Sequence, residues 1–68
     1  MTITIALNGE PRQVAAGTTV AQLVTELDAG PRGVAVARNQ EVVIRSEWAR
    51  TPLVDGDRVD VLRAAQGG

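Results

Sequence analysis

The chain has 68 residues and a formal net charge of −1, with seven Arg against eight acidic residues and no Lys, Cys or His. A domain of this size buries only about 60% of the surface that its unfolded chain exposes, and here neither disulfides nor zinc ligands are available to stabilise it. The charges are dispersed, which argues against nucleic-acid binding. No segment resembles a signal peptide or a membrane span, so we expect a cytoplasmic domain.

The first 15 residues predict a β-hairpin. Aliphatic side chains alternate with Thr and Ala over residues 2–7, which is the period of a strand with one buried face. The pair Asn8-Gly9 tolerates the positive φ angles of a tight turn, so residues 10–15 are expected to return antiparallel. Pro11 marks that second strand as an edge strand.

A short helix is predicted next. Thr19 and Gln22 have the spacing of a capping box, and residues 20–27 carry apolar side chains at i, i+3, i+4 and i+7. This stripe can cover the inner face of the hairpin. The Gly-Pro pair at 30–31 is expected to end the helix.

Two more strands are expected after the helix. Residues 34–37 alternate Val with Ala, Asn39-Gln40 indicates a turn, and residues 42–44 form a short fourth strand. Ser46 is expected to cap a single helical turn around Trp48. Since this is the only aromatic residue in an aliphatic chain, we interpret it as a plug at the open end of the core.

The last turn and strand complete the fold prediction. Asp55-Gly56-Asp57 is a turn signal, and the strand that follows alternates apolar with polar residues. Crossover rules favour placing this strand beside the first one, in parallel, at the centre of the sheet. The expected fold class is α+β: a β-grasp roll in the order ββαββ, with a mixed sheet of four to five strands and one main helix on one face. Residues 1–63 form this domain, and residues 64–68 form a flexible tail.

Four short segments, in this order, resemble one protein family: residues 17–20 (GTTV), 44–48 (IRSEW), 55–57 (DGD) and the terminal Gly67-Gly68. The family is the thiamine-biosynthesis sulfur carriers, often called ThiS, and the similarity covers essentially the whole chain. Membership implies a ubiquitin-like β-grasp fold.

The resemblance also implies a chemistry for the tail. A ubiquitin-activating-type enzyme adenylates the Gly68 carboxylate with ATP, a persulfide donor supplies sulfur, and the resulting thiocarboxylate delivers it to a thiazole synthase. The chain is then a carrier rather than an enzyme. No bound cofactor is expected, because the partner enzyme uses the ATP, and no metal is expected. Glycine at positions 67 and 68 suits this role, since a backbone without Cβ atoms can enter a narrow channel.

The outer face of the sheet is the expected docking surface for these partners. If alternate aliphatic residues face the helix, the opposite face is unusually apolar for a surface in contact with solvent. We hypothesise that the activating enzyme and the sulfur acceptor bind there and along the tail. The candidate contacts are Ala6, Ala35, Ala37, Leu62, Arg63, Ala64, Ala65 and Gln66.

Other interpretations stay open at this point. The sulfur could be destined for molybdopterin, cysteine or another product, and the same tail could instead modify other proteins. A different class of function is a β-grasp module that binds partners noncovalently. Asp55 and Asp57 could suggest a metal site, but calcium needs six to eight oxygen ligands and this turn offers two carboxylates.

Overall fold

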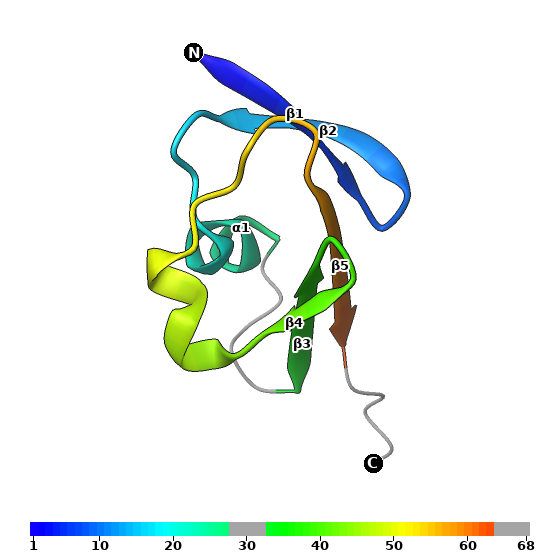
Figure 1. Cartoon of the computed structure of the whole chain (residues 1–68), viewed down its shortest axis with the longest axis vertical. Coiled ribbons are helices and arrows are strands. Elements are labelled where there is room, and N and C mark those ends of the chain that lie inside the picture. Colours follow the sequence, from blue (N-terminus) through cyan, green and yellow to red (C-terminus); the bar gives the residue numbers. More distant parts are fainter. Residues whose placement is uncertain (28–32, 64–68) are drawn as a thin grey trace.

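In the part of the chain that the structure describes, five strands form one mixed sheet that curls around one α-helix (Figure 1). The computed structural model describes residues 1–27 and 33–63. Its elements in chain order are β1 (Thr2–Leu7), β2 (Glu10–Ala15), α1 (Val20–Glu26), β3 (Val34–Arg38), β4 (Glu41–Val43), the 3₁₀ helix η1 (Arg45–Arg50) and β5 (Arg58–Arg63). The strand order is β2-β1-β5-β3-β4, so the last strand lies in the middle. This is the expected β-grasp roll.

The opening hairpin forms as its sequence predicts. Asn8 and Gly9 both have positive φ, 50° and 84°, which gives the two-residue turn the twist that flanking strands need. The register then pairs Leu7 with Glu10 and continues to the other end of both strands. β2 is an edge strand, and Pro11 is tolerated there because an edge strand has one side without a ladder partner.

Helix α1 begins at the predicted capping box. The Thr19 hydroxyl accepts from the Gln22 backbone N–H at 3.2 Å, and the Gln22 side-chain oxygen accepts from the Thr19 N–H at 2.9 Å. Two of the N–H groups that a helix start leaves unpaired are satisfied in this way. The apolar stripe then buries Val20, Leu23 and Val24 against the sheet.

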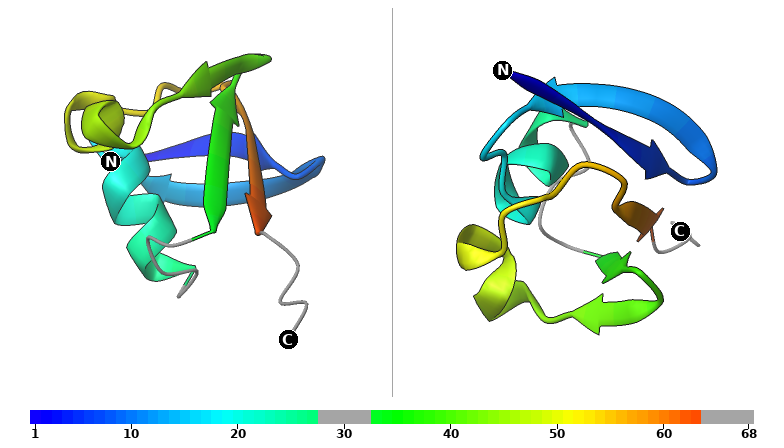
Figure 2. Two further views of the ribbon diagram at one scale, coloured as in Figure 1. Left: turned by 90° about the horizontal axis from the view of Figure 1, so that it is seen from below. Right: turned by 45° about the horizontal axis from the view of Figure 1, so that its top comes forward.

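The aliphatic core lies between α1 and the inner face of the sheet. Figure 2 shows α1 and η1 together on this one side of the sheet. Trp48, in η1, is 6% exposed, and its indole N–H donates to the carbonyl of Val43 at 2.8 Å. Its interpretation as a core plug is confirmed, because the ring packs with the buried cluster while its polar atom is satisfied.

Two predictions for the fourth strand and its surroundings are wrong in detail. β4 spans Glu41–Val43 rather than 42–44, because Asn39 and Gln40 (φ 51° and 71°) form a two-residue turn and the strand starts directly after it. Ser46 does not cap the next helical turn. Ile44 occupies the N-cap position in an extended conformation and no side chain caps the turn, since η1 starts one residue before Ser46.

The remaining sequence predictions about chain ends fall outside the described residues. These are the helix stop at 30–31 and the tail at 64–68, so the boundary between domain and tail stays a prediction. In the part that is described, no helix is both long and apolar enough to cross a bilayer.

Removing the capping box should weaken the fold measurably. Replacing Thr19 by Ala leaves an N–H of the first turn of α1 without its acceptor, so we expect Thr19→Ala to lower the free energy of unfolding by about 1 kcal/mol. Urea denaturation followed by Trp48 fluorescence measures this change. Ser46→Ala is the matched control, because Ser46 makes no capping bond, and an equal loss in both variants would contradict the assignment.

Candidate functional site

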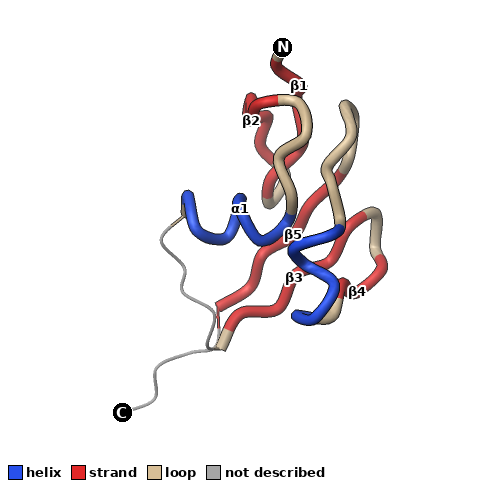
Figure 3. The backbone as a smooth tube through the Cα atoms, turned by 90° about the vertical axis from the view of Figure 1, so that its left-hand side faces the viewer, coloured by secondary structure: helices blue, strands red, loops and turns tan. Residues whose placement is uncertain are grey.

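The central strand β5 leads from the middle of the sheet toward residues 64–68. Figure 3 shows β5 running alongside β3. The two strands pair antiparallel from Val59 to Arg63, whereas β5 pairs in parallel with β1 over only two positions. The parallel contact includes bonds from the Ala6 N–H to the Asp57 carbonyl and from the Asn8 N–H to the Val59 carbonyl, both 2.9 Å. β5 therefore runs on beyond the end of β1.

Asparagine side chains from the two hairpin turns extend the support of β5. The side-chain oxygen of Asn8 accepts from the Val61 N–H at 2.8 Å, past the last residue of β1. On the other edge, the side-chain oxygen of Asn39 accepts from the Arg58 N–H at 2.9 Å. Sequence reasoning assigned these asparagines only to turns, because the partner residues are distant in the chain.

Two aspartates fix the point where β5 starts. Asp55 accepts from the Thr4 N–H at 2.8 Å, which joins the turn to β1. Asp57 is 7% exposed and accepts from the Val54 N–H at 2.8 Å and from the side-chain amide of Asn39 at 3.1 Å. Both carboxylates are thus occupied by protein donors, and the described residues contain no group of three potential metal ligands. The turn interpretation is confirmed by the bond from the Asp57 N–H to the Val54 carbonyl at 2.9 Å and by the positive φ of Gly56, 88°.

The outer face of the sheet carries a small apolar area near the end of β5. Leu62 is 67% exposed and lies opposite Ala35 on β3, while Ala37 lies opposite Val42 on β4, which is 76% exposed. Val59 and Val61 alternate with Leu62 and are buried on the other face. We call Leu62, Ala35, Ala37 and Val42 the outer patch.

Sequence reasoning missed Val42 as a member of the outer patch. The signal was present, because a two-residue turn after Arg38 fixes which β4 side chain shares a face with Ala37. Ala6, in contrast, is on the same face but not in the patch. It pairs with Arg58, four residues before Leu62 on β5, which places it about 13 Å away along the strand. Its role in binding, like that of the patch, stays a prediction.

Arg63 is the last described residue of β5. Its guanidinium donates from Nη2 to the carbonyl of Leu27, at the end of α1, at 3.1 Å. The other tail candidates, Ala64, Ala65, Gln66, Gly67 and Gly68, lie outside the described residues.

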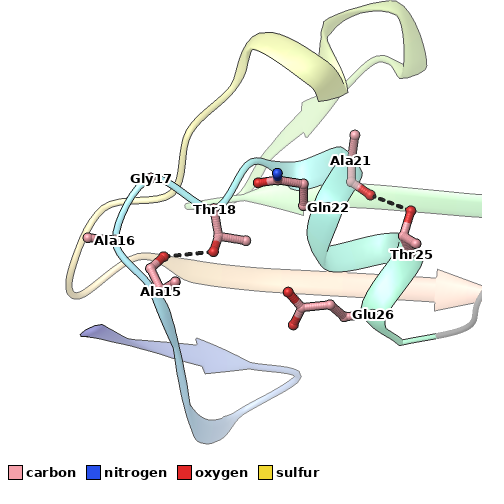
Figure 4. Close-up of a pocket in the computed structure, with 8 residues that line it drawn as sticks. All are labelled: Ala15, Ala16, Gly17, Thr18, Ala21, Gln22, Thr25 and Glu26. Atoms are coloured by element: carbon pink, nitrogen blue, oxygen red, sulfur yellow. Dashed lines mark hydrogen bonds between the residues drawn. The ribbon is translucent and has the colours of Figure 1, made fainter. Parts of the chain in front are cut away.

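A separate open groove of about 570 Å³ lies between the end of β2 and α1 (Figure 4). Its walls are mostly small side chains, and the hydroxyls of Thr18 and Thr25 point back to the carbonyls of Ala15 and Ala21. Its single carboxylate, Glu26, lies 4.0 Å from Arg12. The groove has no convergent set of acid, base or nucleophile, so it does not form a catalytic site.

Comparison with known proteins decides the family. A sequence model of the ThiS family matches residues 5–68, nearly the whole chain. The chain belongs to the ThiS family. The sulfur carrier protein ThiS of Escherichia coli strain K12 is 39% identical over 64 residues, which cover 94% of this chain and 97% of that protein. The resemblance read from the short segments is therefore confirmed.

Two further comparisons extend this result. A crystal structure of the thiamine biosynthesis protein ThiS from Geobacter metallireducens superimposes with a TM-score of 0.81 at 32% identity, covering 97% of this chain and all of that one. The thiazole synthase of Paramagnetospirillum magneticum is 39% identical over 64 residues, which make up 94% of this chain but only 20% of that protein. The ThiS-like region is thus one segment of that much longer chain.

Loss of the Asn8 side chain should loosen β5 near its end. Gly accepts the positive φ of this turn position, so Asn8→Gly removes mainly the acceptor for the Val61 N–H. We expect unfolding to be easier by about 1 kcal/mol and the Val61 amide to exchange faster with deuterium. Gln40→Gly is the control, because it also places a glycine at a turn position with positive φ and leaves the bond to the Val61 N–H intact. Unchanged exchange at Val61 in Asn8→Gly would refute the role of Asn8.

Proposed function

We propose that this chain is a sulfur carrier of thiamine biosynthesis that transports sulfur on the carboxyl group of Gly68. The observation that carries the proposal is the family match, which runs through the diglycine to residue 68. Carriers of this kind are generally not enzymes. The proposal requires that Gly68 carries the free terminal carboxylate in the working protein.

Activation is the first chemical step of the proposal. A carboxylate is a poor electrophile at neutral pH, so a partner enzyme must convert it. A Gly68 carboxylate oxygen attacks the α-phosphorus of ATP and pyrophosphate leaves, giving an acyl-adenylate. ATP is a substrate of that ubiquitin-activating-type enzyme and not a cofactor of the carrier.

Sulfur loading is the second step. The terminal sulfur of a persulfide donor attacks the activated carbonyl and AMP leaves, giving an acyl disulfide. A thiol then cleaves the sulfur–sulfur bond, forming a disulfide with the donor and leaving a thiocarboxylate on Gly68. Sulfur is held in this form as a nucleophile without release of free sulfide.

The acceptor that we propose is a thiazole synthase in the cytoplasm. Support comes from the thiazole synthases that contain a ThiS-like segment, 39% and 41% identical to this chain over 64 residues. Joining a carrier to its acceptor in one chain raises the local concentration of one for the other. Carriage to a different sulfur product is the alternative within the same chemistry.

The outer patch is the docking surface that we propose for both partners. Leu62 and Val42 are exposed beside Ala35 and Ala37, so a partner side chain can bury apolar area against them, with the carboxylate of Asp60, opposite Ala37, as a polar neighbour. Leu62 is one residue from the end of β5, so a partner that binds there also meets the tail. Ala6 and residues 64–66 are proposed as contacts at the border of this interface.

The mass of the protein distinguishes carriage from the other functions. Supplied with ATP, the activating enzyme and a persulfide donor, the chain should gain the mass difference of one oxygen-to-sulfur exchange, measured by intact-mass spectrometry. A Gly68-deleted variant should gain nothing. Appearance of the chain on amines of other proteins would favour a modifier instead. Full function after deletion of Gly67-Gly68 would favour a noncovalent binding module.

A charge in the outer patch should impair docking without unfolding the domain. Leu62 is mostly exposed, so we expect Leu62→Asp to change the unfolding free energy by less than about 0.5 kcal/mol. The activating enzyme should use it with a kcat/KM lower by about tenfold or more, because the carboxylate must be desolvated in the interface. Pyrophosphate release as a function of carrier concentration measures this.

Ser46→Asp is the matched control for Leu62→Asp. It adds the same charge at an exposed position in η1, away from the outer patch. Its kcat/KM should stay near that of the unmodified chain. Normal adenylation of Leu62→Asp would remove the outer patch from the proposal.

A further inference from the structure

Arg63 joins the last described position of β5 to the end of α1, although the two are far apart in sequence. The bond from its Nη2 to the Leu27 carbonyl spans 36 residues. Val34, on β3, lies opposite Arg63 in the sheet. Arg63 is therefore held by β3 on one side and by α1 on another. The end of β5 is therefore attached to the helix as well as to the sheet.

A cation near the C-terminal end of helix α1 is stabilising. Its last turn contains no basic residue, and the final carbonyls of a helix have no partners within it and carry partial negative charge. Arg63 supplies one donor and a positive charge from another element. Arg12 approaches the same region from β2, with its guanidinium 4.0 Å from Glu26. Arginines from two strands thus meet the last turn of α1.

We infer that Arg63 is a positioning residue, which sets the point from which the sulfur-carrying tail leaves the domain. This inference rests on the proposed function. Five residues follow Arg63, and at full extension they reach about 17 Å. The anchor of this short arm determines which volume the Gly68 carboxyl can reach when the outer patch is bound.

The expected consequence is a lower entropic cost of tail insertion. If the last residues of β5 detach, the free segment becomes longer and more conformations must be given up on binding. That cost falls on complex formation, so it should raise KM for the carrier. Once the carboxyl is bound beside ATP, kcat should stay nearly the same.

The experiment compares three variants of the full chain in two measurements. Arg63→Ala removes the anchor, Arg63→Lys retains a donor and the charge, and Arg45→Ala removes the charge of an exposed arginine in η1. Backbone ¹⁵N relaxation of the free carrier reports the order of Leu62 and residue 63. Pyrophosphate release by the activating enzyme gives KM and kcat, and urea denaturation confirms that each variant is folded at the assay temperature.

If Arg63 positions the tail, backbone order in the free carrier and KM should change together. Arg63→Ala should lower the order of both positions in the free carrier and raise KM about threefold to tenfold, with kcat changed less than about twofold. Arg63→Lys should recover most of both effects, and Arg45→Ala should show neither.

Other results would overturn the inference. A raised KM with unchanged order in the free carrier would make Arg63 a direct contact of the partner. Reduced order with an unchanged KM would make it structural only. No pyrophosphate release from the unmodified chain would instead contradict the proposed function itself.

Discussion

The parallel contact between β1 and β5 is the constraint on which the rest of the structure depends. It covers only two paired positions. It nevertheless places β5 between the β1–β2 hairpin and the β3–β4 hairpin, both of which precede β5 in the sequence. Such a short ladder provides few backbone bonds, each with a net contribution of about 1 kcal/mol. Side-chain oxygens of Asn8, Asn39 and Asp55 add bonds where the ladder stops. The β5 strand is held on both edges as a result.

The two faces of the sheet differ in how far their side chains are exposed. On the inner face, Val and Ile side chains pack against α1 and are nearly inaccessible to water. On the outer face, Leu62 and Val42 are exposed beside Ala35 and Ala37, and Asp60 lies opposite Ala37. In the proposed function, stability and partner binding therefore use alternate residues of the same strands.

Most elements were predictable because their signals are local. The Asn8-Gly9 turn, the capping box of Thr19 and the apolar stripe of α1 each depend on residues that are close together in the sequence. The bonds that define the site are not local: Asn8 to Val61 spans 53 residues and Thr4 to Asp55 spans 51. Periodicity carries no information about such pairs. The Arg63 anchor was likewise invisible, whereas Val42 could have been found from the length of the β3–β4 turn.

The parallel register of β1 and β5 also separates the two ends of the described chain. Ala6 lies opposite Arg58, so the start of β1 and the end of β5 extend in opposite directions from that pair, up to about 30 Å apart. Met1 is fully exposed at the far end (Figure 1). A fluorescent dye or an affinity tag attached at Met1 is thus held at the pole of the domain opposite Arg63, away from the end of β5.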